Sequence, residues 1–101
     1  MMSRANELVL YTRPLCGDCQ QAKAYLNDLN IAYEQKNVED NQQVEAELVT
    51  ITGSKIVPAF VFYKKGLFGS SKVVQSFTGF DANKEAIDAQ LSDLKKSWNI
   101  E

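Results

Sequence analysis

The chain has 101 residues, 45% of them hydrophobic and 24% charged, which is typical of one soluble globular domain covering residues 1–101. Its 11 basic and 13 acidic residues give a formal charge of −2, and the basic residues are scattered, so we expect no nucleic-acid partner. The stretch before Pro14 contains only a short apolar run, which is neither a signal peptide nor a membrane span. We therefore expect a cytoplasmic protein with no membrane partner.

Residues 7–11 form an apolar run between polar residues, which predicts a short buried strand. Pro14 and Gly17 then mark a loop. After this loop the apolar residues recur at helical spacing, at Cys19, Ala22, Leu26 and Leu29. The segment from Asn27 to Asn30 provides an end for this first helix.

Residues 31–38 alternate partly between apolar and polar and predict a second strand. Asp40 and Gln43 resemble a capping box, so we expect Asp40 to begin a second helix. The apolar face of that helix consists of Val44, Leu48 and Ile51. Gly53 stands where a helix C-cap glycine belongs.

Residues 59–63 predict a third strand, and residues 73–77 predict a return strand that pairs with it through a hairpin loop. Leu67 and Phe68 in this loop form either an exposed patch for a partner or a cover that folds back on the sheet. Asp81 is placed to cap a last helix. Its apolar residues are Ile87, Leu91, Leu94 and Trp98.

The predicted element order is therefore β-α-β-α-β-β-α. The first two strands are joined by a helix and should be parallel, whereas the last two are joined by a hairpin and should be antiparallel. This pattern predicts the α/β class, with a four-stranded mixed sheet flanked by three helices.

The only two cysteines, Cys16 and Cys19, form a C-x-x-C pair between the first strand and the first helix. In a cytosolic protein such a pair is more often catalytic or metal-binding than structural. The sequence has no histidine, and two cysteines do not complete a tetrahedral zinc site, so we expect no bound metal. The pair therefore predicts thiol–disulfide chemistry.

The position of each cysteine suggests its role. Cys16 falls where the loop meets the helix, and there the backbone N–H groups and the helix dipole favour a thiolate. Cys19 lies about one turn further on, on the apolar face. We expect Cys16 to be the attacking nucleophile and Cys19 to be the resolving thiol.

Asp18 stands between the two cysteines. Its carboxylate should oppose the formation of a thiolate at Cys16 by like-charge repulsion. We therefore expect Asp18 to tune the pair toward a reductant rather than a strong oxidant. Arg13 is a candidate to offset this charge.

Three blocks of the sequence together resemble the glutaredoxin family. They are YTRPLCGDC around the cysteines, Ile56-Val57-Pro58, and the run from Thr78 to Asp81. The resemblance covers residues 7–95 and implies a thioredoxin-like fold and a dithiol oxidoreductase that acts on protein or glutathione mixed disulfides. It also implies that Pro58 is a cis-proline that faces the cysteines.

The resemblance further implies a binding site for glutathione as co-substrate, with no tightly bound cofactor. The main chain of Val57, next to Pro58, would pair with glutathione as a strand pairs with a sheet edge. The amides of Gly79, Phe80 and Asp81 would receive its γ-glutamyl carboxylate. Arg13 and Lys55 stand where the family often has a cation for the glycyl carboxylate.

Two departures keep other functions open. The cysteine run is CGDC where the family usually has CPYC, and Thr78 replaces a glycine. The second departure is similar to the redoxins of ribonucleotide reductase, which thioredoxin reductase reduces without glutathione. An iron–sulfur cluster carrier that uses Cys16 and glutathione is a further alternative, as is a non-catalytic adaptor.

The partners expected from this interpretation are glutathione, disulfide-containing proteins and a thioredoxin reductase, and we expect a monomer. Tyr11 either borders the site or is a core aromatic.

Overall fold

The computed structural model of the chain describes residues 6–65 and 71–98. The elements are β1 (Asn6–Thr12), α1 (Gly17–Asp28), β2 (Glu34–Asn37), α2 (Gln42–Thr52), β3 (Ala59–Lys65), β4 (Ser71–Thr78), the 3₁₀ turn η2 (Asp81–Asn83) and α3 (Lys84–Trp98). This order confirms the predicted β-α-β-α-β-β-α sequence of elements. The two hairpin residues Leu67 and Phe68 lie outside the described residues.

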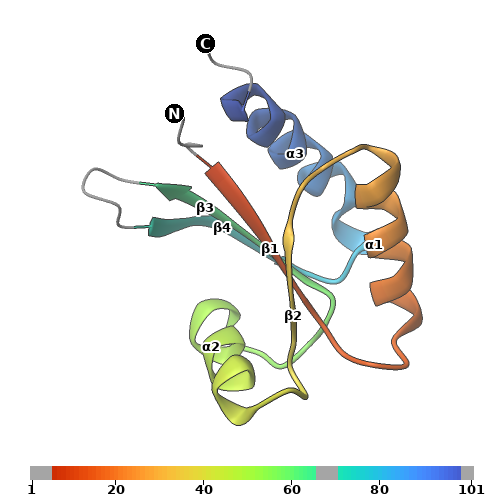
Figure 1. Cartoon of the computed structure of the whole chain (residues 1–101), viewed down its shortest axis with the longest axis vertical. Helices are drawn as coiled ribbons and strands as arrows, with labels where there is room; N and C mark the ends of the chain where they lie inside the picture. The colour runs from red at the N-terminus through yellow and green to blue at the C-terminus, as the bar shows by residue number, and fades with distance from the viewer. Residues whose placement is uncertain (1–5, 66–70, 99–101) are drawn as a thin grey trace.

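The four strands form one mixed sheet in the order β2-β1-β3-β4 (Figure 1). β1 and β2 are parallel, whereas β3 is antiparallel to both β1 and β4. Ala59 is paired with Tyr11 on one side and with Thr78 on the other. The end of β1, the start of β3 and the end of β4 therefore meet at one edge of the sheet.

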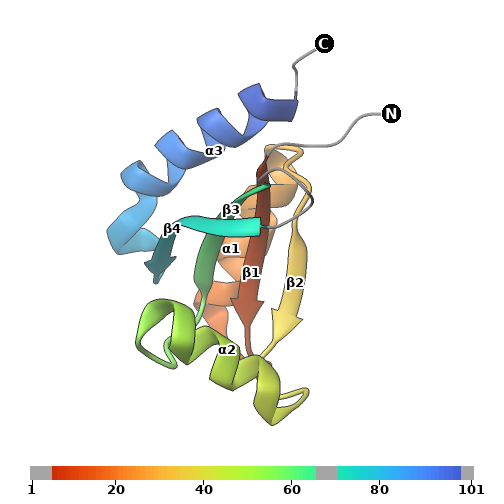
Figure 2. The ribbon, with the colours of Figure 1, turned by 90° about the vertical axis from the view of Figure 1, so that its left-hand side faces the viewer.

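Helices cover both faces of this sheet: α1 and α3 lie on one face and α2 on the other (Figure 2). Leu8 and Leu10 of β1 pack into the core beneath α1 and α3, whereas Val9 and Tyr11 pack into the core beneath α2. Because residues 8–11 of β1 are buried on both faces, they form a continuous apolar run. None of the helices in residues 6–65 and 71–98 is long and apolar enough to cross a membrane.

The first helix buries Cys19, Ala22 and Leu26, as predicted. The helix ends within the predicted segment of residues 27–30, because Leu29 is its C-cap residue and is 37% exposed. The chain turns at Asn30, which has a positive φ of 59°, and Ile31 then enters the core.

The second strand is shorter than the predicted span of residues 31–38. The ladder with β1 runs only from Val9–Glu34 to Thr12–Asn37. Ile31 and Val38 are both buried, which explains the apolar pattern, but they lie beyond the two ends of β2.

The prediction that Asp40 caps α2 is wrong by one residue. Asn41 is the N-cap, and its Oδ1 accepts the N–H of Val44 at 2.9 Å. The other end is as predicted: Gly53 closes α2 with a φ of 82°, a conformation that glycine adopts without steric cost.

The prediction that Asp81 caps the last helix is also wrong. Asp81 is the first residue of η2, which has no side-chain cap, and α3 begins only at Lys84. The side chain that holds this turn is Asn83, whose Nδ2 donates to the carbonyl of Thr78 at 2.7 Å.

Candidate functional site

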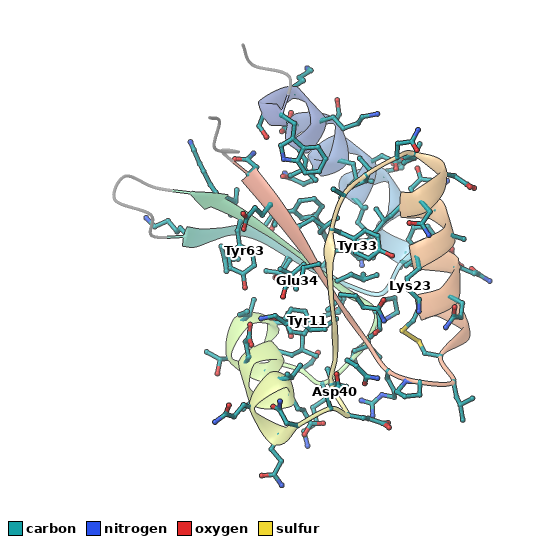
Figure 3. All side chains as sticks on the ribbon, in the orientation of Figure 1. Tyr11, Lys23, Tyr33, Glu34, Asp40 and Tyr63 are labelled. Carbon is teal, nitrogen blue, oxygen red and sulfur yellow. A yellow bond between two sulfur atoms is a disulfide. The ribbon has the colours of Figure 1, made fainter. Side chains whose placement is uncertain are left out.

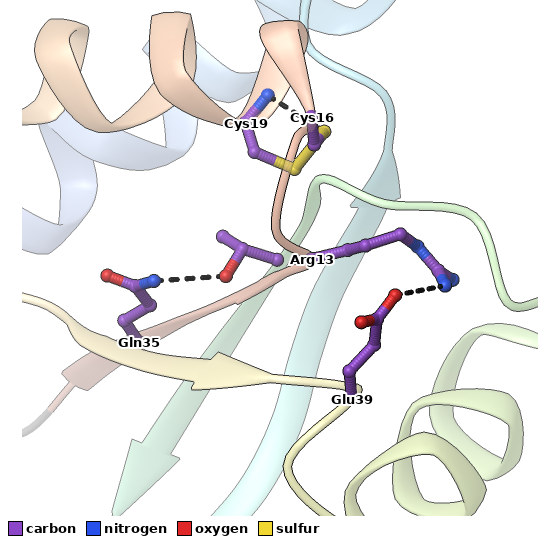
Figure 4. The surroundings of a disulfide bond; sticks show 6 residues. Arg13, Cys16, Cys19, Gln35 and Glu39 are labelled. Carbon is purple, nitrogen blue, oxygen red and sulfur yellow. Dashed lines mark hydrogen bonds and ion pairs between the residues drawn. A yellow bond between two sulfur atoms is a disulfide. The ribbon is translucent and has the colours of Figure 1, made fainter.

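The two cysteines form a disulfide at the start of α1, with a Cα–Cα distance of 5.2 Å (Figure 4). Cys16 is the N-cap residue of the helix, and its Sγ accepts the backbone N–H of Cys19 at 3.1 Å. Cys16 is half-buried, whereas Cys19 is completely buried. A disulfide substrate therefore reaches the sulfur of Cys16 first, and a helix N–H already points at that sulfur.

Asp18 lies in the first turn of α1 with an exposed side chain. In this position the carboxylate interacts favourably with the helix dipole. It also places a negative charge two residues from Cys16, at the end of the helix where a thiolate would form. The geometry is therefore compatible with the tuning role predicted for Asp18.

Pro58 follows Val57 through a cis peptide bond, as predicted, and is almost completely buried. Val57 is half-buried, and Ile56 before it is 58% exposed. The carbonyl of Pro58 accepts the N–H of Gly79 at 2.8 Å. This hydrogen bond joins two of the three blocks that the sequence singled out.

The turn after β4 depends on Gly79, whose φ of 92° is unfavourable for other residues. The side chain of Phe80 is buried, with its ring 6.0 Å from that of Phe60 and 5.3 Å from that of Tyr25. Only the main chain of Phe80 is therefore available to a ligand. Asp81 is exposed at the start of η2.

Both predicted cations have an acidic neighbour in the chain itself. Arg13 Nη1 lies 3.3 Å from Glu39 Oε2, and Lys55 Nζ lies 4.0 Å from Glu45 Oε1. The cation predicted to offset Asp18 thus pairs with Glu39 instead. Glu39 and Glu45 are not predicted from the sequence, because each belongs to a different loop or helix from its cation and no local pattern connects them.

Tyr11 is a core residue and does not border the site. It is fully buried and points toward α2, where its hydroxyl donates to Glu47 Oε2 at 2.5 Å (Figure 3). Burial and the bond to Glu47 raise the pKa of Tyr11. Lys36 also donates to Glu47 Oε2, at 2.8 Å, so this carboxylate ties α2 to β1 and β2.

One further polar contact lies at the end of β1. The side chain of Thr12 is buried, and its Oγ1 accepts the amide of Gln35 at 3.0 Å (Figure 4). The carbonyl of Thr12 accepts the N–H of Val38 at 2.9 Å. These two bonds hold β2 and Val38, the residue that follows it, against the segment that leads to Cys16.

Comparison with known proteins supports the interpretation of this site. The family model for glutaredoxin matches residues 8–66, which is more than half of the chain. No curated protein sequence is significantly similar to the chain.

Several solved structures have the same architecture. A thioredoxin from Trichomonas vaginalis has a TM-score of 0.67 and 22% identity, and the match covers 88% of this chain and 78% of that one. A glutaredoxin from Archaeoglobus fulgidus has a TM-score of 0.60 and 19% identity, with coverages of 80% and 83%. A buckwheat glutaredoxin in complex with glutathione has a TM-score of 0.62 and 24% identity, with coverages of 95% and 83%. These matches confirm the predicted thioredoxin-like fold.

Proposed function

Because this chain belongs to the glutaredoxin family, we propose that it reduces protein disulfides and glutathione mixed disulfides, and that glutathione then restores its dithiol. The coarser activity is established by the family and by the cysteine pair: the protein is a thiol–disulfide oxidoreductase. The choice of glutathione as co-substrate is the part that this proposal adds.

The proposed cycle begins with the reduced pair. The thiolate of Cys16 attacks one sulfur of the substrate disulfide, and the other substrate sulfur leaves as a thiolate that takes up a proton. The thiolate of Cys19 then attacks Cys16 Sγ and displaces the second substrate thiol. The pair has lost two electrons and two protons to the substrate, and two molecules of glutathione return them while becoming glutathione disulfide.

The observation that carries this proposal is the position of Cys16 as N-cap of α1. Its sulfur already accepts a helix N–H, which would stabilise a thiolate there, while the buried Cys19 is held within one turn of it. A buried second thiol is protected from outside reagents but close enough to close the ring. This asymmetry supports an attacking Cys16 and a resolving Cys19.

The surroundings of the pair support a peptide-like thiol as co-substrate. Val57 lies before the buried cis-proline, and in this proposal its backbone would supply the edge that an extended peptide pairs with. The N–H of Gly79 donates to the carbonyl of Pro58, so the turn after β4 is held beside the cis-proline. The buckwheat relative is a glutaredoxin–glutathione complex. We include a cytoplasmic location in the proposal, because glutathione keeps thiols reduced in that compartment.

Two coupled assays on one protein disulfide test the proposal. In the first, glutathione, glutathione reductase and NADPH regenerate the protein, and in the second, thioredoxin reductase and NADPH do so. We expect turnover with glutathione, and Cys16→Ser is the inactive control. Turnover with thioredoxin reductase alone would contradict glutathione as co-substrate.

One observation favours a second candidate, a redoxin that thioredoxin reductase reduces directly. The two cations expected to bind the glycyl carboxylate, Arg13 and Lys55, both have a carboxylate of the chain beside them. A protein that does not use glutathione needs no free cation there. The second coupled assay measures this alternative directly.

A further inference from the structure

We propose that Glu39 is a specificity-determining residue that lowers the reactivity of the Cys16–Cys19 pair toward small anionic disulfides. It does so by occupying Arg13, the guanidinium that stands three residues before Cys16 (Figure 4). This inference rests on the proposed function, because it concerns which disulfides the pair accepts.

Arg13 is available to a substrate apart from this one contact. Its side chain is 36% exposed, and the pair with Glu39 uses a single nitrogen, Nη1. A guanidinium has five N–H donors and forms its strongest pairs with two at once. A carboxylate on a substrate at Cys16 would therefore find donors on Arg13, but it would compete with Glu39 for the charge.

Two backbone hydrogen bonds fix the turn that carries Glu39. Its N–H donates to Asn37 Oδ1 at 2.8 Å, and the preceding N–H, of Val38, donates to the carbonyl of Thr12 at 2.9 Å. Thr12 is the neighbour of Arg13 in the chain. The turn that carries Glu39 is thus attached to the segment that carries its cation.

The net charge of the two loops around Cys16 and Glu39 also disfavours an anionic substrate. Residues 13–18 and 38–41 contain one cation, Arg13, and three carboxylates, those of Asp18, Glu39 and Asp40. An anionic substrate meets a surface of net negative charge, and Glu39 is the member that also neutralises the single cation. By contrast, Lys55 Nζ lies 4.0 Å from Glu45 Oε1 and the Lys55 side chain is 68% exposed, so Glu45 holds its cation less firmly.

The test compares two disulfides of different charge. Glutathione disulfide carries more carboxylates than ammonium groups, whereas bis(2-hydroxyethyl) disulfide is neutral. The reduced protein is mixed with each one, the reaction is quenched with an alkylating agent, and mass spectrometry follows the loss of the two thiols. The readout is the ratio of the two second-order rate constants, which cancels any change in the general reactivity of Cys16.

We expect Glu39→Gln to raise the ratio in favour of glutathione disulfide by about two- to fivefold, the range that an exposed ion pair provides. Asp93→Asn is the matched control. It removes one exposed carboxylate from the C-terminal half of α3, the part of the helix where Lys95 donates to the carbonyl of Leu29 at the far end of α1 from Cys16. This variant should leave the ratio unchanged.

The double variant Arg13→Gln with Glu39→Gln separates the proposed route from a general effect of charge. If Glu39 acts by occupying Arg13, the gain from Glu39→Gln disappears when Arg13 is absent. A gain that persists without Arg13, or an equal gain in Asp93→Asn, would overturn the inference. If the wild-type protein reacts with neither disulfide, the proposed function itself fails, which is a different result.

Discussion

Replacing Glu47 by leucine should destabilise the protein by about 2–3 kcal/mol. Tyr11 is completely buried and its hydroxyl donates to Glu47, so the leucine removes this acceptor and leaves the buried hydroxyl with only Tyr63 as a polar neighbour, which costs about 1–3 kcal/mol. Lys36 loses the same carboxylate. The side chains of Lys36 and Glu47 are each about one-third exposed, so the loss of their ion pair adds less than about 1 kcal/mol.

Tyr11→Phe is the matched variant, because it removes the donor instead of the acceptor. It should cost only about 0.5–1.5 kcal/mol, since no buried polar group is left unpaired on the tyrosine side. When Tyr11→Phe is already present, Glu47→Leu should cost at least about 1 kcal/mol less than in the wild type, because the buried hydroxyl that loses its acceptor is gone. Urea unfolding followed by circular dichroism gives all four free energies of unfolding.

Additive free energies of unfolding for the two substitutions would contradict this coupling. If the two substitutions add to within about 0.5 kcal/mol, the hydroxyl and the carboxylate are not coupled in solution. In that case Glu47 does not hold α2 to β1 through Tyr11.

The site and its surroundings give three further predictions. Asp18→Asn should raise the reduction potential of the cysteine pair, because it removes a charge that opposes the thiolate; a potential that is unchanged or lower in equilibrium with a glutathione buffer would contradict this. Gly79→Ala should cost about 1–2 kcal/mol in thermal unfolding because of its φ of 92°, although the added Cβ would make only an ordinary contact with Asn83 Nδ2 at 3.9 Å, and an unchanged Tm would exclude strain there. Burial raises the pKa of Glu47, but the hydrogen bonds from Lys36 and Tyr11 outweigh burial, and the pKa of Glu47 is lowered in the folded protein. The charged Glu47 therefore stabilises the fold above its unfolded-state pKa, and this stabilisation is lost as the pH falls through its folded-state pKa. Glu47→Leu should therefore flatten the loss of stability below about pH 4, and parallel curves for variant and wild type would contradict the shift.

The elements that the sequence predicted best are those whose signals are local. Pro14 and Gly17, followed by apolar residues three and four apart, place the start of α1 and put Cys16 at its N-cap. Gly53 marks the end of α2, because only a residue that tolerates a positive φ closes the helix in this way. These features depend on a few neighbouring residues, so the sequence alone identifies them.

The errors arise where tertiary contacts decide between neighbouring candidates. Asp40 and Asn41 are both good capping residues, and the path of the chain after β2 selects Asn41. Asp81 could have capped α3, but the turn closes through Asn83 on Thr78 instead. In each case the local chemistry was suitable at more than one position.

The candidate site was predicted only in part for the same reason. The cysteines and the cis-proline belong to recognisable motifs, and strand pairing brings them to one edge of the sheet. The partners of the two cations lie 26 residues from Arg13 and ten residues from Lys55, on other elements, so their pairing requires the folded chain. Glu39 is therefore visible only in the structure.

Trapping the mixed disulfide shows which of the two cysteines attacks the substrate. Reduced Cys19→Ser and Cys16→Ser are each mixed with glutathione disulfide, and intact-mass spectrometry follows the glutathione adduct. We predict that the adduct accumulates on Cys16 in Cys19→Ser, because the attacking thiol remains and the resolving thiol is missing. An adduct that forms equally fast on Cys19 in Cys16→Ser would contradict the assignment.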